Sequence, residues 1–275
     1  MTGPNAAYCL AHHRLERPRT TASKGAPPLA GAPVRGVVLD AASLLDGDAN
    51  WRRRLIRLIN QLGIPAQRDT FFRDWDHLYL REVHAGHREY GEAFESFLLA
   101  AGLSWAQVDE VEAASRRERE DLEQNPRALP GAAKTVAGLA QRGFELLAWA
   151  DSPFPAQQTV RSLQQLGLAD SFSAVISSFD IGFALPSLRC FEAVIERALL
   201  PAEMLVYAGP DPATLQAAQA AGLRAVAFNA PQGVAADACV GQFEDLCQLL
   251  EQTGSAPTAT APSRPLCASQ PRSQA

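Results

Sequence analysis

The chain has 275 residues, with 25 Lys or Arg against 30 Asp or Glu, so its formal net charge is −5. A mildly acidic protein of this kind is poorly suited to nucleic acid or to anionic lipid, and we expect it to bind neither. Hydrophobic residues make up 47% of the chain and charged residues 20%, which is typical of a globular protein. No apolar run approaches the roughly 18 residues that a membrane-spanning helix needs.

The cysteines and the first residues bear on the cellular compartment. The five cysteines are odd in number and never form a Cys-x-x-Cys pair, which favours reduced thiols over a disulfide framework or a structural zinc site. Charged residues and histidines interrupt residues 1–31, so this stretch lacks the unbroken apolar segment of a secretory signal. We therefore expect a cytoplasmic protein.

Both ends of the chain are expected to be disordered tails. Residues 1–33 and 253–275 together hold nine of the nineteen prolines, and Ala, Ser and Thr also accumulate there. Apolar periodicity disappears in these stretches, which is typical of segments that cannot bury enough apolar surface to fold. The folded body is then expected over residues 34–252.

The folded body begins with a short apolar run and continues with a long helical block. Residues 36–39 are apolar and end in Asp40, as in a buried parallel strand whose carboxyl end presents a polar residue. Residues 49–125 have helical spacing instead, and we find no convincing strand among them. Aromatic residues spaced like the core of this block are Trp51, Phe71, Phe72, Trp75 and Tyr79.

Strands and helices alternate after residue 130. Helices are predicted over residues 132–142, 155–166, 191–199 and 212–221, and strands over residues 145–150, 174–177, 204–208 and 225–228. Such alternation, with right-handed crossovers, predicts an α/β protein with a doubly wound, parallel, Rossmann-like sheet. The core domain would comprise residues 34–48 and 126–252, and residues 49–125 would form an all-helical cap inserted after the first strand.

Ligands of such sheets bind at the carboxyl ends of the strands. In this sequence those ends are Asp40, Asp151, residues 177–180 and residues 209–211. The sequence therefore predicts a site that gathers several aspartates at one edge of the sheet.

Five short motifs follow one another along the folded body: Val37-Val38-Leu39-Asp40-Ala41-Ala42-Ser43-Leu44-Leu45, Leu129-Pro130-Gly131-Ala132, residues 146–153, Gly182-Phe183-Ala184-Leu185-Pro186, and Ala208-Gly209-Pro210-Asp211-Pro212 leading to residues 221–223. In this order and spacing they resemble the haloacid dehalogenase-like (HAD) hydrolase superfamily, in its branch with a helical cap. The resemblance covers nearly the whole folded body.

The resemblance implies a role for Asp40 and leaves other family roles unfilled. Asp40 matches the nucleophile that takes up a phosphoryl group or displaces a halide. Four further positions of the family motifs, which supply a general acid, a phosphoryl-binding hydroxyl, a lysine and a magnesium ligand, here carry Ala42, Ala150, Leu185 and Pro210. The motifs are therefore degenerate.

These substitutions favour a protein without ordinary phosphatase chemistry. A carboxylate that attacks a phosphate dianion needs a positive charge beside it, and the chain has no lysine after Lys134. Our main interpretation is a pseudoenzyme: a HAD-fold binding or regulatory protein with no cofactor and no metal. Its partner would be a small ligand in the former substrate pocket at the strand ends, or a protein that binds the cap or the tails. A homodimer is also possible from the sequence.

The alternative is a HAD-like hydrolase of phosphatase or dehalogenase type that uses Asp40 as nucleophile with non-standard partners. Asp151, Ser152 and Arg189 are then the candidate binding residues, and Asp40 with Asp211 would be the candidate Mg²⁺ ligands. A simpler reading makes Asp40 and Asp151 caps of the turns that follow their strands.

Overall fold

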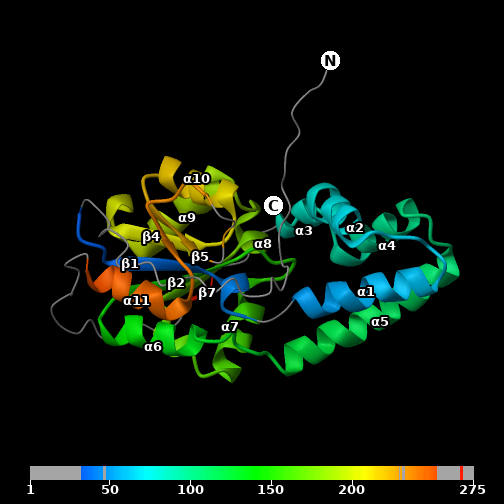
Figure 1. Ribbon diagram of the computed structural model, residues 1–275, viewed down its shortest axis with the longest axis horizontal. Helices are drawn as coiled ribbons and strands as arrows, with labels where there is room; N and C mark the ends of the chain where they lie inside the picture. Colours follow the sequence, from blue (N-terminus) through cyan, green and yellow to red (C-terminus); the bar gives the residue numbers. More distant parts are fainter. Residues whose placement is uncertain (1–31, 46–47, 229, 231–232, 253–266, 269–275) are drawn as a thin grey trace, which may run out of the picture.

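The computed structural model describes residues 32–45, 48–228, 230, 233–252 and 267–268. These residues form an α/β core and a helical cap that lies beside it (Figure 1). Apart from residues 32, 33, 267 and 268, the two predicted tails lie outside the described part of the chain. Within the described part, no helix combines the length and the apolar character needed to cross a membrane.

The core is built on a parallel sheet of seven strands in the order β6-β5-β4-β1-β2-β3-β7. Each neighbouring pair of strands is parallel. The strands are β1 (Gly36–Asp40), β2 (Glu145–Ala150), β3 (Ala174–Ser177), β4 (Leu205–Gly209), β5 (Arg224–Phe228), β6 (Ala238–Val240) and β7 (Cys267–Ala268). This arrangement confirms the predicted doubly wound, Rossmann-like fold.

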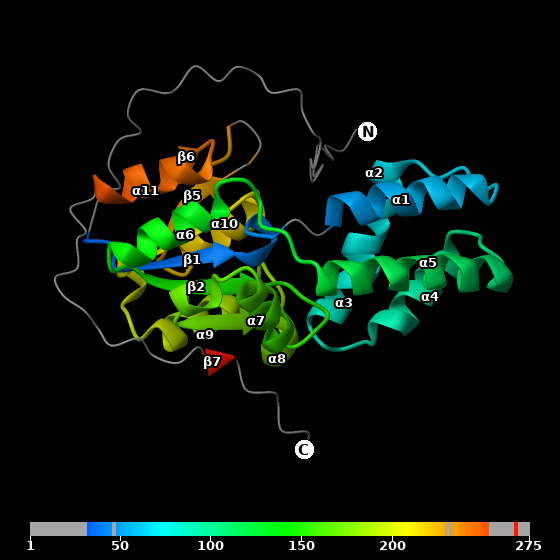
Figure 2. The same cartoon turned by 90° about the horizontal axis from the view of Figure 1, so that it is seen from below.

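Helices cover both faces of the sheet because the buried strand residues alternate in direction. Val37 and Leu39 pack with α6 (Ala132–Gln141), α7 (Ala156–Gln165) and α11 (Phe243–Glu251) on one face. Val38, between them, packs on the other face with α9 (Leu188–Ala198) and α10 (Pro212–Ala220). The two helix layers are visible above and below the sheet in Figure 1, and Figure 2 looks onto the lower one. Strands buried on both faces explain the continuous apolar runs in the sequence.

Besides the short helices η1 (Ala41–Ser43), η3 (Ala169–Ser171), α8 (Ser178–Ile181) and η4 (Ala202–Met204), three elements at the edges of the sheet were not predicted. The strand β6 and the helix α11 complete the sheet edge beyond β5, with Phe243, Leu246 and Leu250 of α11 buried against it. The third element corrects the predicted disorder of residues 253–275 at two positions, since Cys267 and Ala268 pair with β3. Backbone pairing along a sheet edge requires no apolar periodicity, so the sequence pattern gave no sign of it.

The cap is all-helical, as predicted, and no strand occurs in the described residues between Asp48 and Gln124. Its helices are α1 (Asp48–Gln61), α2 (Arg68–Asp74), the π-helix η2 (Trp75–Leu80), α3 (Arg81–His84), α4 (Tyr90–Ala100) and α5 (Trp105–Gln124). The chain enters and leaves the cap through two segments that lie side by side, because Leu45 and Ala128 form an isolated antiparallel bridge.

Aromatic side chains form the core of the cap. Trp75 is 1% exposed, and its indole contacts the rings of Tyr79, Tyr90, Phe94 and Phe97. The predicted core residues Trp51, Phe71 and Phe72 are also buried, and Tyr79 packs against them at the edge of the cluster. The aromatic spacing in the sequence therefore identified the cap core correctly.

The cap touches the core domain through an aromatic pair and a close backbone approach. The ring of Tyr90 in α4 stacks on Phe154, which follows β2, at 6.5 Å between centroids and 23° between planes. Gly86 lies so close to α8 (Ser178–Ile181) that a Cβ at this position would be 3.2 Å from the carbonyl oxygen of Phe179. These contacts hold the cap beside the carboxyl ends of the strands.

Replacing Phe154 by alanine is expected to loosen this contact. An aromatic pair contributes about 1 kcal/mol beyond the area that it buries, which corresponds to roughly fivefold easier local opening. Hydrogen exchange of the α3 and α8 amides should therefore be about fivefold faster in Phe154→Ala. Phe183→Ala, which removes a core-domain phenylalanine that is 40% exposed, is the control and should leave that exchange unchanged. Equal exchange in the wild type and Phe154→Ala would show that the ring pair does not hold the cap.

Candidate functional site

The neighbouring parallel strands β4, β1 and β2 have their carboxyl ends side by side. These ends face the cap, as the direction of the β1 arrow in Figure 2 shows. The register pairs Asp40 of β1 with Trp149 of β2, and Leu39 with Ala208 of β4. Asp40, Asp151 and Asp211 stand at or just after these three strand ends. The structure thus brings the three predicted aspartates to one edge of the sheet.

Asp40 uses both carboxylate oxygens inside the fold. Its Oδ1 accepts a hydrogen bond of 2.9 Å from the backbone N–H of Ala42, which makes Asp40 the N-cap of the short helix η1 (Ala41–Ser43). Its Oδ2 accepts a longer bond of 3.3 Å from the hydroxyl of Tyr207 in β4. Burial, with a smaller contribution from the neighbouring Asp211, raises the pKa of Asp40 to about 6, although both hydrogen bonds favour the charged form.

Asp151 is held in a similar way. Its Oδ1 accepts hydrogen bonds from the indole Nε1 of Trp149, at 3.0 Å, and from the backbone N–H of Leu185, at 3.2 Å. The residue as a whole is exposed, but its carboxyl group is turned toward these donors. Burial of the carboxyl and the nearby charge of Asp40 raise the pKa of Asp151 to about 7. Close to neutral pH, a negative charge on Asp40 therefore disfavours ionisation of Asp151.

Ser152 takes part in the turn that follows β2. Its hydroxyl oxygen accepts a bond of 3.1 Å from the backbone N–H of Phe154, and its own backbone N–H donates to the hydroxyl of Ser178 at 3.0 Å. These bonds tie the end of β2 to α8. The position of Ser152 at the strand ends agrees with the prediction, while its hydroxyl already has an internal partner.

Arg189 does not join the aspartates in the structure. Its guanidinium pairs with Glu192 one turn later on α9, at 3.0 Å, and both side chains are more than half exposed. The helix begins at Leu188, capped by Ser187, whose hydroxyl accepts a bond from the backbone N–H of Arg189. This start places Arg189 in the first turn, on the solvent side. Its binding role therefore stays a prediction from the sequence.

The family resemblance implies Mg²⁺, and the residues present do not fit that ion. Oδ2 of Asp211 accepts bonds of 2.7 Å from both the backbone N–H and the hydroxyl of Thr214, and so caps α10. Magnesium needs near-octahedral oxygen ligands, and Asp40 with Asp211 would supply only two carboxylates already engaged in hydrogen bonds. In the part of the chain that the structure describes, no group of three or more His, Cys, Asp or Glu side chains could hold a metal.

Apolar or small side chains occupy the four positions at which the family motifs carry polar groups. Ala150 is buried at the end of β2, and Leu185 packs against the apolar cluster under α9 and α10. Ala42 contributes only its backbone N–H to Asp40. Pro210 is half-buried between β4 and α10. The groups that shift the pKa values of Asp40 and Asp151 include no lysine or arginine of the described residues.

Two residues of the site were missed by the sequence analysis. Tyr207 and Trp149 each donate a hydrogen bond to a strand-end carboxylate, and both are 1% exposed. They lie in strands that read as apolar runs, where an aromatic residue signals packing rather than polar contact. Trp149 is two residues from Asp151, whereas Tyr207 is 167 residues from Asp40, so no local spacing could have revealed it.

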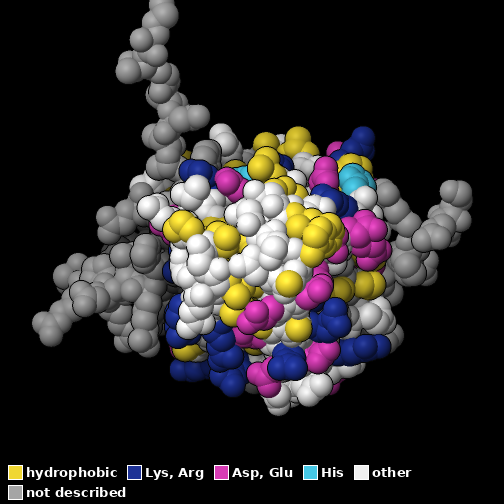
Figure 3. All heavy atoms as spheres, turned by 90° about the vertical axis from the view of Figure 1, so that its right-hand side faces the viewer, with side chains coloured by type: hydrophobic (Ala, Val, Ile, Leu, Met, Phe, Trp, Pro, Cys, Tyr) yellow, Lys and Arg dark blue, Asp and Glu magenta, His cyan; other side chains and the backbone are white. Residues whose placement is uncertain are grey.

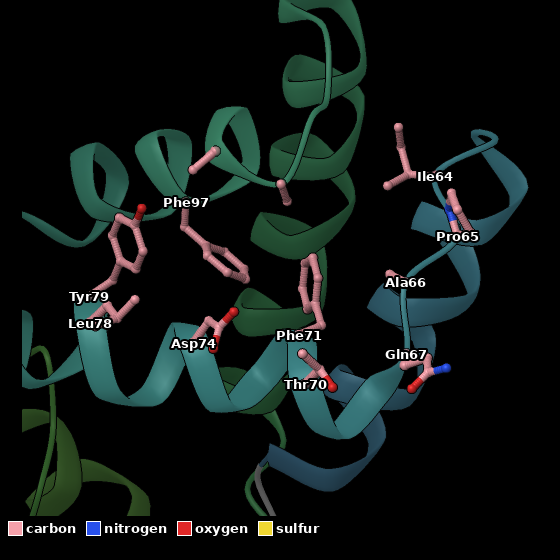
Figure 4. Close-up of a pocket in the computed structure, with 12 residues that line it drawn as sticks. Ile64, Pro65, Ala66, Gln67, Thr70, Phe71, Asp74, Leu78, Tyr79 and Phe97 are labelled. Atoms are coloured by element: carbon pink, nitrogen blue, oxygen red, sulfur yellow. The ribbon is translucent and has the colours of Figure 1, made fainter. Parts of the chain in front are cut away.

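A groove lies on the cap, away from the strand ends. It has a volume of about 310 Å³ and lies between α2, η2, the end of α4 and residues 64–67. Figure 4 shows Phe71 and Asp74 pointing from the α2–η2 segment toward Phe97. Leu78 at its rim is 65% exposed. Seen from the end of the cap in Figure 3, apolar side chains form several separate groups on this face, and charged side chains are densest on its lower part. The cap therefore has an apolar surface separate from the strand-end site.

Comparison with known proteins agrees with this fold. The family model for haloacid dehalogenase-like hydrolases matches residues 34–222 of the chain. A curated relative, the phosphoglycolate phosphatase of Yersinia pseudotuberculosis serotype I (strain IP32953), is 24% identical over 226 residues, which are 78% of this chain and 91% of the relative. The phosphoglycolate phosphatase of Yersinia pestis matches with the same identity and coverage.

Solved structures give the same architecture. YfnB from Bacillus subtilis, assigned as a HAD-hydrolase and solved with bound magnesium, superimposes with a TM-score of 0.61 at 22% identity, over 80% of this chain and 100% of its own. A HAD phosphatase from Thermococcus onnurineus gives 0.58 at 19% identity, over 82% and 100%. A 2-haloacid dehalogenase from Pseudomonas syringae pv. Tomato DC3000 gives 0.53 at 22% identity, over 80% and 99%. At these identities the likeness shows the fold alone.

Proposed function

The chain belongs to the haloacid dehalogenase-like hydrolase family, and on that premise we propose that it is a non-catalytic binding or regulatory member of it. One observation carries this proposal. The carboxylates at the strand ends accept hydrogen bonds from the protein itself, and no cation of the described residues contributes to the pKa of Asp40 or Asp151. Such a site is arranged for structure rather than for attack on a phosphate.

Charge explains why this arrangement is unfavourable for phosphoryl transfer. Two like unit charges about 4 Å apart repel by roughly 4 kcal/mol at an effective dielectric constant of about 20. A phosphate dianion at these strand ends would meet Asp40 and Asp151, and no cation of the described residues contributes to the pKa of either carboxyl. Loss of a positioned general acid, at the position of Ala42, lowers a rate by a further 10² to 10⁴. A neutral or cationic small molecule fits the charge of the site better than a phosphorylated one.

The cap offers a place for the regulatory role. Its apolar groove, with Phe71, Tyr79 and Phe97 in the lining and Leu78 exposed at the rim, has the composition of a surface that binds a partner. A protein partner at the cap and a small ligand at the strand ends are compatible with each other, since the cap groove and the strand-end site are formed by different residues.

The second candidate function is that of a hydrolase with Asp40 as nucleophile, and the comparisons favour it. The matched family is a hydrolase family, and the curated relatives are phosphoglycolate phosphatases that align over 91% of their length. Asp40 keeps the strand-end position that a nucleophile requires. Asp151 and Ser152 would then be its binding partners, and Asp40 with Asp211 would have to give up their hydrogen bonds to Ala42, Tyr207 and Thr214 before they could ligate Mg²⁺.

Turnover measurements separate the two functions. The full chain is assayed with an aryl phosphate, with phosphoglycolate and with a 2-haloacid, each with and without Mg²⁺, beside the Asp40→Asn variant. We expect rates equal to those of Asp40→Asn under every condition. Hydrolysis that requires Mg²⁺ and disappears in Asp40→Asn would overturn the non-catalytic proposal and establish the hydrolase. The matched control is Asp170→Asn, an exposed aspartate far from the strand ends, which should behave as the wild type in either case.

A further inference from the structure

The hydroxyl of Tyr207 is a buried polar group that no family role explains. It lies in the central strand β4, the residue is 1% exposed, and its hydroxyl donates a hydrogen bond to Oδ2 of Asp40. Burial and the surrounding carboxylates raise the pKa of Tyr207 above its usual value, so the phenol keeps its proton and remains a donor at neutral pH. A protonated phenol donates a hydrogen bond without bringing a positive charge to the site, whereas an ammonium group would bring one.

The ring of Tyr207 is fixed from two sides. Phe191 of α9 meets it edge-on, at 5.5 Å between centroids and 89° between planes. On the other side lies Gly209, where an added Cβ would be only 2.6 Å from the Tyr207 hydroxyl oxygen and 2.8 Å from Cε1. The absence of a side chain at position 209 is therefore what allows the phenol to reach Asp40.

We propose that Tyr207 is the positioning residue of the strand-end site: packed on Gly209, its phenol holds Oδ2 of Asp40 inside the fold and withholds that oxygen from ligands. This inference deepens the proposed function and rests on it. The family motif contains a glycine at position 209, and in this chain that glycine serves the packing of Tyr207. Asp40 then acts as a structural acceptor that joins η1 to β4, because Ala42 holds its other oxygen.

The titration of Asp40 tests this contact directly. The groups that face Asp40 are the Ala42 N–H from η1, Tyr207 from β4, and the carboxyls of Asp151 after β2 and Asp211 before α10. A donor to a carboxylate stabilises its charged form, so removal of the phenol hydroxyl must raise the pKa of Asp40. One lost hydrogen bond corresponds to an increase of about one pH unit, from about 6 toward 7.

The experiment uses the full chain labelled with ¹³C at the aspartate carboxyls, and identifies the Asp40 signal by its loss in Asp40→Asn. Tyr207→Phe should shift the Asp40 midpoint upward by about one unit. Gly209→Ala should shift it in the same direction, because the new Cβ displaces the phenol. Tyr79→Phe, a matched change in the cap, should leave it unchanged.

An Asp40 midpoint that is the same in the wild type and in folded Tyr207→Phe would overturn the inference. If Gly209→Ala does not fold, Tyr207→Phe alone decides the question. The outcome is independent of the turnover assays: Asp40-dependent hydrolysis would overturn the proposed function and leave the Tyr207 shift in place, while an unchanged midpoint would remove the role of Tyr207 and leave the turnover result in place.

Discussion

Replacing Trp75 by alanine is expected to lower the free energy of unfolding by about 4 kcal/mol. Trp75 is 1% exposed and touches four aromatic rings in the cap, so its removal leaves a large cavity that the surrounding helices cannot fill. Substitutions of buried Phe or Trp by Ala cost about 3–5 kcal/mol. The indole also lies at the start of the π-helix η2, where the helix hydrogen bonding is already irregular.

Urea denaturation followed by circular dichroism measures this effect, and Trp105→Ala is the matched control. Trp105 is 63% exposed at the first turn of α5, so its replacement should change the free energy of unfolding by less than about 0.5 kcal/mol. Equal destabilisation by the two substitutions would contradict the assignment of Trp75 to the cap core. A separate early transition in Trp75→Ala would show that the cap unfolds on its own.

The sequence predicted the central strands well because their signal is local. The strands Gly36–Asp40, Glu145–Ala150 and Ala174–Ser177 have the predicted bounds, since each is an apolar run closed by a polar residue or a turn. The helix α11 has an equally local signal, because Phe243, Leu246 and Leu250 recur at spacings of three and four residues on one buried face, although no helix was predicted beyond residue 221.

The candidate site was predictable in its position but not in its bonding. The rule that parallel strands end at one edge placed Asp40, Asp151 and Asp211 together. It did not show where each carboxylate points, because Asp211 turns to Thr214 and Asp151 to the backbone of Leu185. Those choices depend on donors that become available only when the chain is folded.

The Asp40→Asn variant is expected to become more stable relative to the wild type as the pH rises. Burial raises the pKa of Asp40 from 3.8 to about 6, so the folded protein binds this proton more tightly than the unfolded chain does. The stabilisation from that proton is complete below about pH 3.8 and is lost as the pH rises through about 6. The full difference is about 3 kcal/mol, of which about 1.5 kcal/mol falls between pH 5 and pH 8.

Chemical denaturation of both proteins at pH 5 and pH 8 measures this difference. Asparagine keeps an oxygen for the Ala42 N–H and carries no charge, so the difference in free energy of unfolding should move by about 1.5 kcal/mol in favour of Asp40→Asn between the two pH values. Asp170→Asn, at an exposed site, should show the same difference from the wild type at both pH values.

The sign of this change also reports on the charge around Asp40. A lysine or a divalent cation at the strand ends would favour the carboxylate, lower its pKa and make the charged form stabilising, so that Asp40→Asn would lose stability relative to the wild type as the pH rises. Among the described residues, the groups around Asp40 are the neutral donors Ala42 and Tyr207 and the carboxyls Asp151 and Asp211, so its charged form is costly and the change has the opposite sign. A stability measurement without any substrate thus tests the feature on which the non-catalytic proposal depends, because a loss of stability on ionisation of Asp40 indicates that no cation of the described residues offsets its charge.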